Sequence, residues 1–451
     1  IDTSTNYTDG ESELLIGSVL AEGDKTGSMK REEAIVVSKI GYVQGQNLKR
    51  AEARERSGRP YPEMVKYGDG IWHCIHPEFL ADQLDSSLDR LSVQTLDVCL
   101  LHNPEYFLSD AKHKAEQQST SPDQPGLREE FYRRVQAAFT YFEAQVAAGR
   151  LQYYGVSSNT CTATPDDPEG TSLSRMLEAA RAAAAQGGRQ THHFKILQCP
   201  MNLFESGALL TPNTGPGERQ TVLELAQAEG IAVLVNRPLN AISSKGGSMT
   251  RLAEFPIEET DASFDTQQPR VEELEQEFRR DLAPGIPHGG QGLPPQDYFR
   301  WAEELKRIRP MIHNLEHWEQ IEGQMIAPHI NQVLRALGQH LTGDRAERWD
   351  TWRGRYIPEL LKTLQALRRE ASIKSRQKTA ALSALIDPLL PEPRRQESLS
   401  RKALWILAST PAVTCVLNGM RSKAYVADSL GILYWEPLPA PRPIYEAIKT
   451  L

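Results

Sequence analysis

Short apolar runs alternate with amphipathic stretches over the first 240 residues of the chain. The apolar runs are rich in Val, Ile, Leu and Tyr and are bounded by polar turns, as is typical of parallel strands buried on both faces. Strands are predicted at 34–38, 96–101, 151–156, 194–198 and 231–235. Helical patterns lie between them, at 77–91, 127–148, 173–185 and 221–228. This alternation predicts βαβ units and a parallel sheet.

The alternation stops near residue 240. A stretch rich in Pro and Gly, residues 284–295, precedes long helical patterns that each carry one apolar stripe. The first stripe is formed by Leu305, Ile308, Ile312 and Leu315. Because residues 241–398 hold no convincing strand, we expect an all-helical insertion with a Pro/Gly-rich lead-in.

The βα pattern returns at the end of the chain, with a helix at 399–408 and a strand at 413–417. Residues 1–240 and the final part, residues 399–451, are therefore expected to form one α/β domain that the insertion interrupts. This gives six strands, plus a stub at the very start of the chain.

Composition and charge narrow the function classes. With 39% hydrophobic and 24% charged residues, the chain resembles soluble globular proteins. A formal net charge of −8 argues against a nucleic-acid partner. No apolar run approaches about 18 residues, so no transmembrane helix and no membrane partner are expected. The five cysteines form no CxxC motif, which favours a reducing compartment and a cytoplasmic location.

Four residues of complementary chemistry lie at or just after the C-terminal ends of predicted strands: Asp2, Tyr7, Lys39 and His102. In a (β/α)8 barrel all such ends face one mouth, so residues distant in sequence converge. A phenol is a weak acid, with a pKa near ~10, and a nearby ammonium favours its ionised form. A carboxylate keeps that ammonium charged, and an imidazole can hydrogen-bond a substrate oxygen. These groups predict a proton-transfer site for carbonyl reduction, with hydride from a cofactor.

The motifs around these residues are similar to signatures of the aldo/keto reductase family. Four of them occur in the family's order: Asp-Thr-Ser-x-x-Tyr (2–7), Ser-Lys-Ile-Gly (38–41), Leu-Asp-x-x-Leu-Leu-His-Asn-Pro (96–104) and Gly-Arg-Leu-x-Tyr-Tyr-Gly-Val-Ser-Ser-Asn (149–159). The resemblance implies an α/β fold of the (β/α)8 TIM-barrel type that lacks its first strand and helix. The helical insertion would lie between the seventh and eighth strands.

The resemblance also implies a function. Asp2, Tyr7, Lys39 and His102 match the family's catalytic tetrad, with Tyr7 as the general acid/base. The expected activity is NAD(P)H-dependent reduction of a small-molecule carbonyl (an aldehyde, ketone or sugar) to an alcohol, or the reverse reaction.

A set of cofactor-binding residues follows from the same resemblance. Those near the nicotinamide are Ser157, Ser158, Gln198, Asn202, Pro238 and Leu239. Those near the phosphates are Gly419, Arg421, Ser422 and Tyr425. A helix N-terminus attracts phosphate, and a guanidinium can donate two hydrogen bonds to it. Arg421 and Lys423 suit a 2′-phosphate, which favours NADP and leaves NAD open; no metal is implied.

The sequence departs from the family pattern in three places. Many relatives have an aromatic residue that stacks on the nicotinamide where this chain has Val-Asn-Arg-Pro-Leu (235–239). Extra residues at 42–75 form either a loop that shapes the substrate pocket or ordinary surface. The family's first strand and helix should precede Ile1, so we expect an incomplete chain with open strand edges that is poorly stable or inactive as written. A targeting segment upstream of Ile1 would lie outside this chain.

Two other functions stay open. A non-catalytic, cofactor-binding scaffold could act on a protein partner, or self-associate, through its helical insertion. Residues 313–317 match H-x-x-E-H, a zinc-protease pattern, but Leu315 belongs to the apolar stripe and no third ligand is evident. NADPH oxidation with a panel of carbonyl compounds separates a reductase from the scaffold, and zinc analysis tests the protease.

Overall fold

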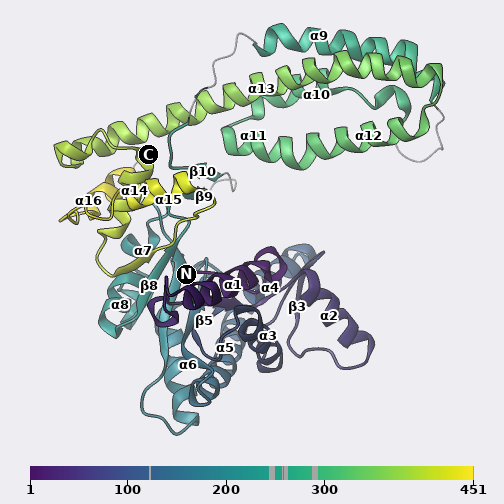
Figure 1. Cartoon of the computed structure of the whole chain (residues 1–451). Helices are drawn as coiled ribbons and strands as arrows, with labels where there is room; N and C mark the ends of the chain where they lie inside the picture. The colour runs from purple at the N-terminus through teal and green to yellow at the C-terminus, as the bar shows by residue number, and fades with distance from the viewer. Residues whose placement is uncertain (121–122, 243–248, 256, 258–262, 287–292, 450–451) are drawn as a thin grey trace. The chain divides into compact units, whose positions relative to one another are not determined.

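The computed structural model describes residues 1–120, 123–242, 249–255, 257, 263–286 and 293–449. They form two compact units (Figure 1). The barrel unit comprises residues 1–238 and 403–451, and the helical unit comprises residues 239–402. None of the helices within these described ranges is long and apolar enough to cross a membrane.

A six-stranded parallel sheet forms the centre of the barrel unit. Its strands, in spatial order, are β1 (Val37–Ile40), β5 (Leu96–His102), β6 (Leu151–Ser157), β7 (Phe194–Pro200), β8 (Ala232–Asn236) and β11 (Val413–Val416). Each neighbouring pair is parallel. Asp2, in the predicted stub, forms an isolated parallel bridge with Val37. The predicted α/β fold class, with a large helical region after the strands, is confirmed.

Helices follow the strands of the barrel unit. They are α1 (Glu11–Thr26), α2 (Gly45–Arg56), α3 (Pro77–Leu91), α4 (Tyr106–Gln118), α5 (Gln124–Ala147), α6 (Leu173–Gln186), α7 (Gly207–Leu210), α8 (Val222–Glu229), α14 (Leu399–Ala408), α15 (Lys423–Leu430) and α16 (Arg442–Ile448). The bounds of α3 and α14 are those predicted. The signals for α3 are local: Pro77 occupies its first turn, the His76 side chain accepts the Glu78 N–H, and Ser92 ends it in the left-handed conformation.

The extra residues at 42–75 form a substructure of their own. It contains α2 and a three-stranded antiparallel sheet in the order β2 (Tyr42–Val43), β4 (Ile71–His73), β3 (Val65–Gly68). Tyr42 pairs with His73 across β2 and β4. Because β2 directly follows β1, this sheet begins at the C-terminal end of a barrel strand.

The helical unit consists mainly of α9 (Phe264–Glu277), α10 (Trp301–Ile308), α11 (Leu315–Ile321), α12 (Ala327–His340) and α13 (Asp344–Ile386). π-Helical segments follow α9 and α11, at Phe278–Leu282 and Glu322–Ile326. An antiparallel pair, β9 (Asn240–Ile242) and β10 (Met249–Arg251), stands at its start. This pair is not predicted from the sequence, because three-residue strands leave too short a periodic signal.

Aromatic rings fill the core of the helical unit. Phe278, Phe299, Trp349, Trp352 and Tyr356 contact one another with centroid separations of 4.5–6.3 Å. Such large buried rings supply most of the apolar area that holds helices together. The helical unit therefore has a hydrophobic core of its own.

We expect Gly155→Ala to destabilise the barrel unit by about 3 kcal/mol or more. The β6–β7 pairing is irregular here, and an added Cβ would overlap the carbonyl oxygen of Ile196. Gly68→Ala in β3 is the control, since no heavy atom lies within 4 Å of a Cβ added there. Urea denaturation measures the free energy of unfolding; equal stability of the two variants would contradict the close approach.

Candidate active site

Strand register brings one residue from each central strand to the same edge of the sheet. His102 at the end of β5 pairs with Ser157 of β6, which pairs with Gln198 of β7. Lys39 pairs with Leu100, so it lies on β1 near the same C-terminal edge. This edge is the end at which barrel enzymes place their active sites.

Lys39 carries a charge into the protein interior. Its side chain is 0% exposed, and its Nζ lies 2.6 Å from Asp2 Oδ1 and 2.7 Å from the carbonyl oxygen of Thr3. An ammonium removed from water is tolerated only with such close partners. Asp2 and Lys39 therefore form a partly buried ion pair near the C-terminal edge of the sheet.

Tyr7 lies beside this ion pair. The Lys39 ammonium is 4.8 Å from the centroid of the Tyr7 ring, in cation–π geometry. The same ring meets the His102 ring edge-on at a centroid distance of 6.0 Å. Tyr7 is 39% exposed, so its hydroxyl can be reached from solvent. The structure thus brings together all four residues that the sequence analysis selected.

His102 is buried, and its Nδ1 lies 3.0 Å from Ser4 Oγ. Burial, followed by the charge of Lys39 and the proximity of His73, lowers the pKa of His102 well below its usual value. The ring is therefore neutral at physiological pH. A neutral imidazole keeps one N–H with which to donate a hydrogen bond.

Aromatic residues of the 42–75 substructure and of α4 form a group of contacting rings that reaches His102 through Tyr42. The ring of Tyr42 lies 4.7 Å from that of His102, and Tyr106 contacts Tyr42, Tyr67 and His73. His73 Nε2 donates to the carbonyl oxygen of His102 at 2.7 Å, and burial lowers its pKa to about 4. Residues 42–75 were expected to form either a loop that shapes the substrate pocket or ordinary surface. The contact with His102 favours the first alternative.

The residues proposed for the nicotinamide separate into two groups. Gln198 donates from Nε2 to Asp2 Oδ2 at 2.7 Å, and its Oε1 accepts from Ser157 Oγ at 3.2 Å. Ser157 and Gln198 thus join the Asp2–Lys39 pair. Ser158 instead bonds Thr171 (3.0 Å), and Asn202 donates to Glu205 (2.7 Å).

Polar groups occupy the positions where relatives have a stacking aromatic ring. Asn236 Nδ2 donates to Gln198 Oε1 at 3.3 Å, and Arg237, in the left-handed conformation (φ 53°), pairs with Glu205 at 2.6 Å. Pro238 is the last residue of this stretch of the barrel unit. Leu239 begins the helical unit, where its carbonyl oxygen accepts the Leu252 N–H.

The segment proposed for the phosphates lies between β11 and α15. Ser422 is the N-cap of α15, its Oγ accepting the Tyr425 N–H at 3.3 Å. Arg421 and Tyr425 are exposed, and nothing lies within 4 Å of a Cβ added at Gly419. An open loop with exposed cations before a helix N-terminus is compatible with phosphate binding.

Glu105, three residues after His102, is a buried acid that was not among the residues selected from the sequence. One carboxylate oxygen accepts the Asn159 N–H at 2.6 Å, while Oε2 has no partner among the described residues. Burial raises the pKa of Glu105 to about 7, even though hydrogen bonds from its own backbone N–H and from that of Asn159 favour the charged form. The one signal in the sequence is that Glu105 follows His102 closely. Its burial cannot be predicted from the sequence.

No cluster of three His, Cys, Asp or Glu side chains that could hold a metal occurs among the described residues. The rings of His313 and His317 stack on each other at 5.2 Å. Leu315, between them, is buried with the core of the helical unit. Nothing here favours the zinc-protease reading.

The structure shows a six-stranded parallel sheet within an α/β unit, with Asp2, Tyr7, Lys39 and His102 gathered at its C-terminal edge. The model of the aldo/keto reductase family matches residues 1–252. The chain therefore belongs to the aldo/keto reductase family, whose members are oxidoreductases that act on carbonyl compounds.

Solved structures similar to the chain share little sequence with it. An aldo-keto reductase from Bacillus halodurans, in its holo form, is 14% identical with a TM-score of 0.41, over 100% of this chain and 80% of that chain. A glycerol dehydrogenase from Gluconobacter oxydans is 13% identical with a TM-score of 0.42, over 99% and 80%. An aldo/keto reductase from Klebsiella pneumoniae, in complex with NADP and acetate, is 18% identical with a TM-score of 0.28, over 53% and 52%. No curated protein matches the chain.

We expect the pH dependence of stability to change in Glu105→Gln. The carboxyl titrates near 4.5 when unfolded and near 7 when folded, so the folded chain binds more protons between these values. Stability of the wild type should therefore fall as pH rises through this range, by about 1.4 kcal/mol per pKa unit, while the glutamine variant lacks this contribution. Urea denaturation at several pH values measures both; parallel profiles would show that Glu105 is not perturbed.

Proposed function

We propose that this chain reduces a small carbonyl compound, an aldehyde, ketone or sugar, with NADPH. The observation that carries the proposal is the meeting of Asp2, Tyr7, Lys39 and His102 at one edge of the sheet. A half-exposed phenol beside a buried ammonium is a suitable proton donor, because the ammonium favours the phenolate that remains.

The residues at the strand ends fit a nicotinamide. The hydroxyl of Ser157 and the amides of Gln198 and Asn236 gather there, and Asn236 Oδ1 is buried without a partner in the described part of the chain. A carboxamide group could satisfy such donors and acceptors. Ser158 and Asn202 would contribute only by exchanging their present partners. Arg421, Ser422 and Lys423, with Gly419 and Tyr425 beside them, would hold the phosphates. When bound, the cofactor supplies the hydride.

In the proposed reaction Tyr7 would supply the proton: as the carbonyl is reduced, its oxygen would take the proton of the Tyr7 hydroxyl. His102, neutral because it is buried, donates its N–H to the carbonyl oxygen and orients it. Lys39, held by Asp2, lies 4.8 Å from the centre of the Tyr7 ring, where its positive charge would offset the negative charge left on the oxygen when the proton departs. Tyr7 then regains a proton from solvent, to which it is exposed.

The choice of NADPH over NADH rests on Arg421 and Lys423. Both are exposed at the start of α15 and form no ion pair within the described ranges. Two cations at a helix N-terminus suit the extra phosphate of NADPH.

Tyr7→Phe should lower turnover by about 10²–10⁴-fold while NADPH binding is kept, since only the proton donor is removed. Turnover with a panel of aldehydes, ketones and sugars, together with fluorescence titration of NADPH, measures both effects. Tyr434→Phe, at a tyrosine that is 91% exposed, is the matched control. Near-normal turnover of Tyr7→Phe would refute its role. If the wild type binds NADPH but reduces none of these compounds, the chain is a cofactor-binding scaffold.

Arg421→Ala should weaken NADPH binding about tenfold and leave NADH binding nearly unchanged, because only NADPH carries the 2′-phosphate. Arg442→Ala, which removes an arginine paired with Glu446 in α16, is the control. Titration of both cofactors provides the two dissociation constants. An equal loss for NADH and NADPH would contradict the assignment of the 2′-phosphate to Arg421.

A further inference from the structure

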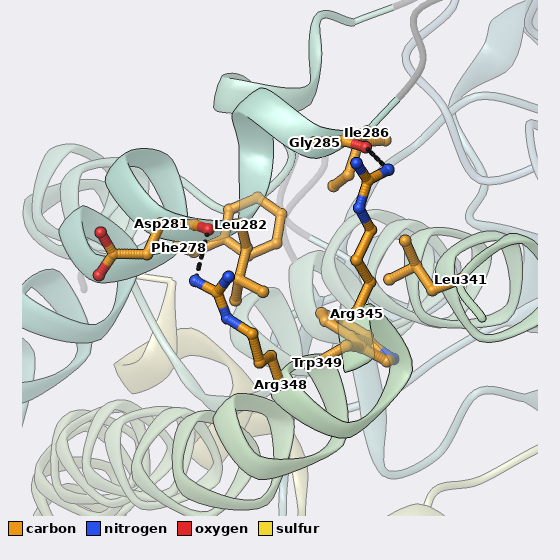
Figure 2. Close-up of a pocket in the computed structure, with 9 residues that line it drawn as sticks. All are labelled: Phe278, Asp281, Leu282, Gly285, Ile286, Leu341, Arg345, Arg348 and Trp349. Atoms are coloured by element: carbon orange, nitrogen blue, oxygen red, sulfur yellow. Dashed lines mark hydrogen bonds between the residues drawn. The ribbon is translucent and has the colours of Figure 1, made fainter. Parts of the chain in front are cut away.

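A pocket in the helical unit lies between the end of the α9 segment and the start of α13 (Figure 2). Its volume is about 170 Å³. It is lined by Phe278, Asp281, Leu282, Gly285, Ile286, Leu341, Arg345, Arg348 and Trp349. A cavity of about 150 Å³ is large enough for benzene, so this pocket can hold one six-membered ring.

The backbone on one side of the pocket is irregular. The α-helix α9 passes into π-helix at Phe278–Leu282 and then into a 3₁₀ turn at Ala283–Gly285. Figure 2 shows two arginine side chains reaching this segment from α13. Arg345 donates to the carbonyl oxygen of Gly285 at 2.8 Å, and Arg348 to that of Asp281 at 3.0 Å. Single-turn π segments of this kind occur often at functional sites.

The two guanidinium groups keep most of their hydrogen-bonding capacity. Each has five N–H donors, and the described contacts use one of them. Neither arginine has a carboxylate within ion-pair distance among the described residues, whereas Arg353 and Arg355 on the same helix are paired. The acid of the pocket, Asp281, is paired with Arg280, and its carboxylate points away from both guanidinium groups in Figure 2.

A tryptophan belongs to the pocket wall. Trp349 is 2% exposed, and its indole Nε1 is buried without a hydrogen-bond partner in the part of the chain that the structure describes. In Figure 2 this nitrogen lies at the end of the ring away from both guanidinium groups, so Trp349 contributes its ring to the pocket wall. The rings of Trp349 and Phe278 and the side chain of Leu282 complete a wall suited to a flat apolar group.

We propose that this pocket binds a small aromatic carboxylate. Its ring would lie against Phe278, Leu282 and Trp349, and its carboxylate would accept hydrogen bonds from Arg345 and Arg348. Planar guanidinium groups match the geometry of a carboxylate, and the volume admits one ring and little more. The site is independent of the reductase chemistry proposed for the barrel unit.

Calorimetric titration of the full chain with benzoate tests this proposal. Benzoate should bind saturably at millimolar concentration or below. Benzamide, which has the same shape but no charge, and inorganic phosphate, which has charge but no ring, should each bind at least about tenfold more weakly. The double variant Arg345→Gln/Arg348→Gln should lose at least about tenfold in benzoate affinity. Arg353→Gln, which removes an exposed paired arginine of α13, should not change it.

A second variant keeps the proposal testable if the double variant does not fold. Leu341→Trp fills the pocket and keeps both arginines, so it should also abolish benzoate binding. Absence of saturable benzoate binding to the wild type, equal affinity for benzamide, or unchanged affinity in a folded double variant would each overturn the proposal. If the folded double variant kept its affinity for benzoate, the benzoate would bind elsewhere on the chain. The Tyr7→Phe turnover assay tests the proposed reductase function separately, so the two proposals can fail independently.

Discussion

The enclosure of the Lys39 ammonium is the constraint on which the rest of the site depends. An isolated charge in the interior is unstable, so the first residues of the chain must supply its partners, Asp2 and the carbonyl of Thr3. The backbone is held accordingly, with the Thr3 N–H donating to Val37 and the Thr5 N–H to Lys39. The second oxygen of Asp2 accepts from Gln198 and so extends the network to β7.

The sequence was most informative where the signals are local or repeat regularly. The strand runs were found to within three residues at each end, because buried parallel strands are almost uniformly apolar. Convergence of Tyr7, Lys39 and His102 could also be predicted, because parallel topology brings all strand ends to one edge. The roles of these residues in catalysis and cofactor binding remain predictions. The structure gives the positions of the side chains, whereas a role in catalysis is a property of the reaction.

Features that depend on tertiary contacts could not be read from the sequence. Residues 42–75 carry no long periodic pattern, yet the Tyr42 ring contacts that of His102, and the His73 side chain bonds the His102 carbonyl oxygen. The enclosure of Glu105 depends on the loop after β6, which is distant in sequence. The close approach of Gly155 to Ile196 likewise follows from an irregular register between two strands.

The helical unit is inserted into the connection between β8 and β11, two strands that pair directly with each other. If residues 239–402 were an unstructured loop, closing it would cost about 4–5 kcal/mol of chain entropy, for a loop of roughly 160 residues. A folded insertion removes much of that cost. Assembly of the last strand of the sheet is thereby coupled to the folding of a unit with a separate hydrophobic core, so damage to that core would loosen β11 as well.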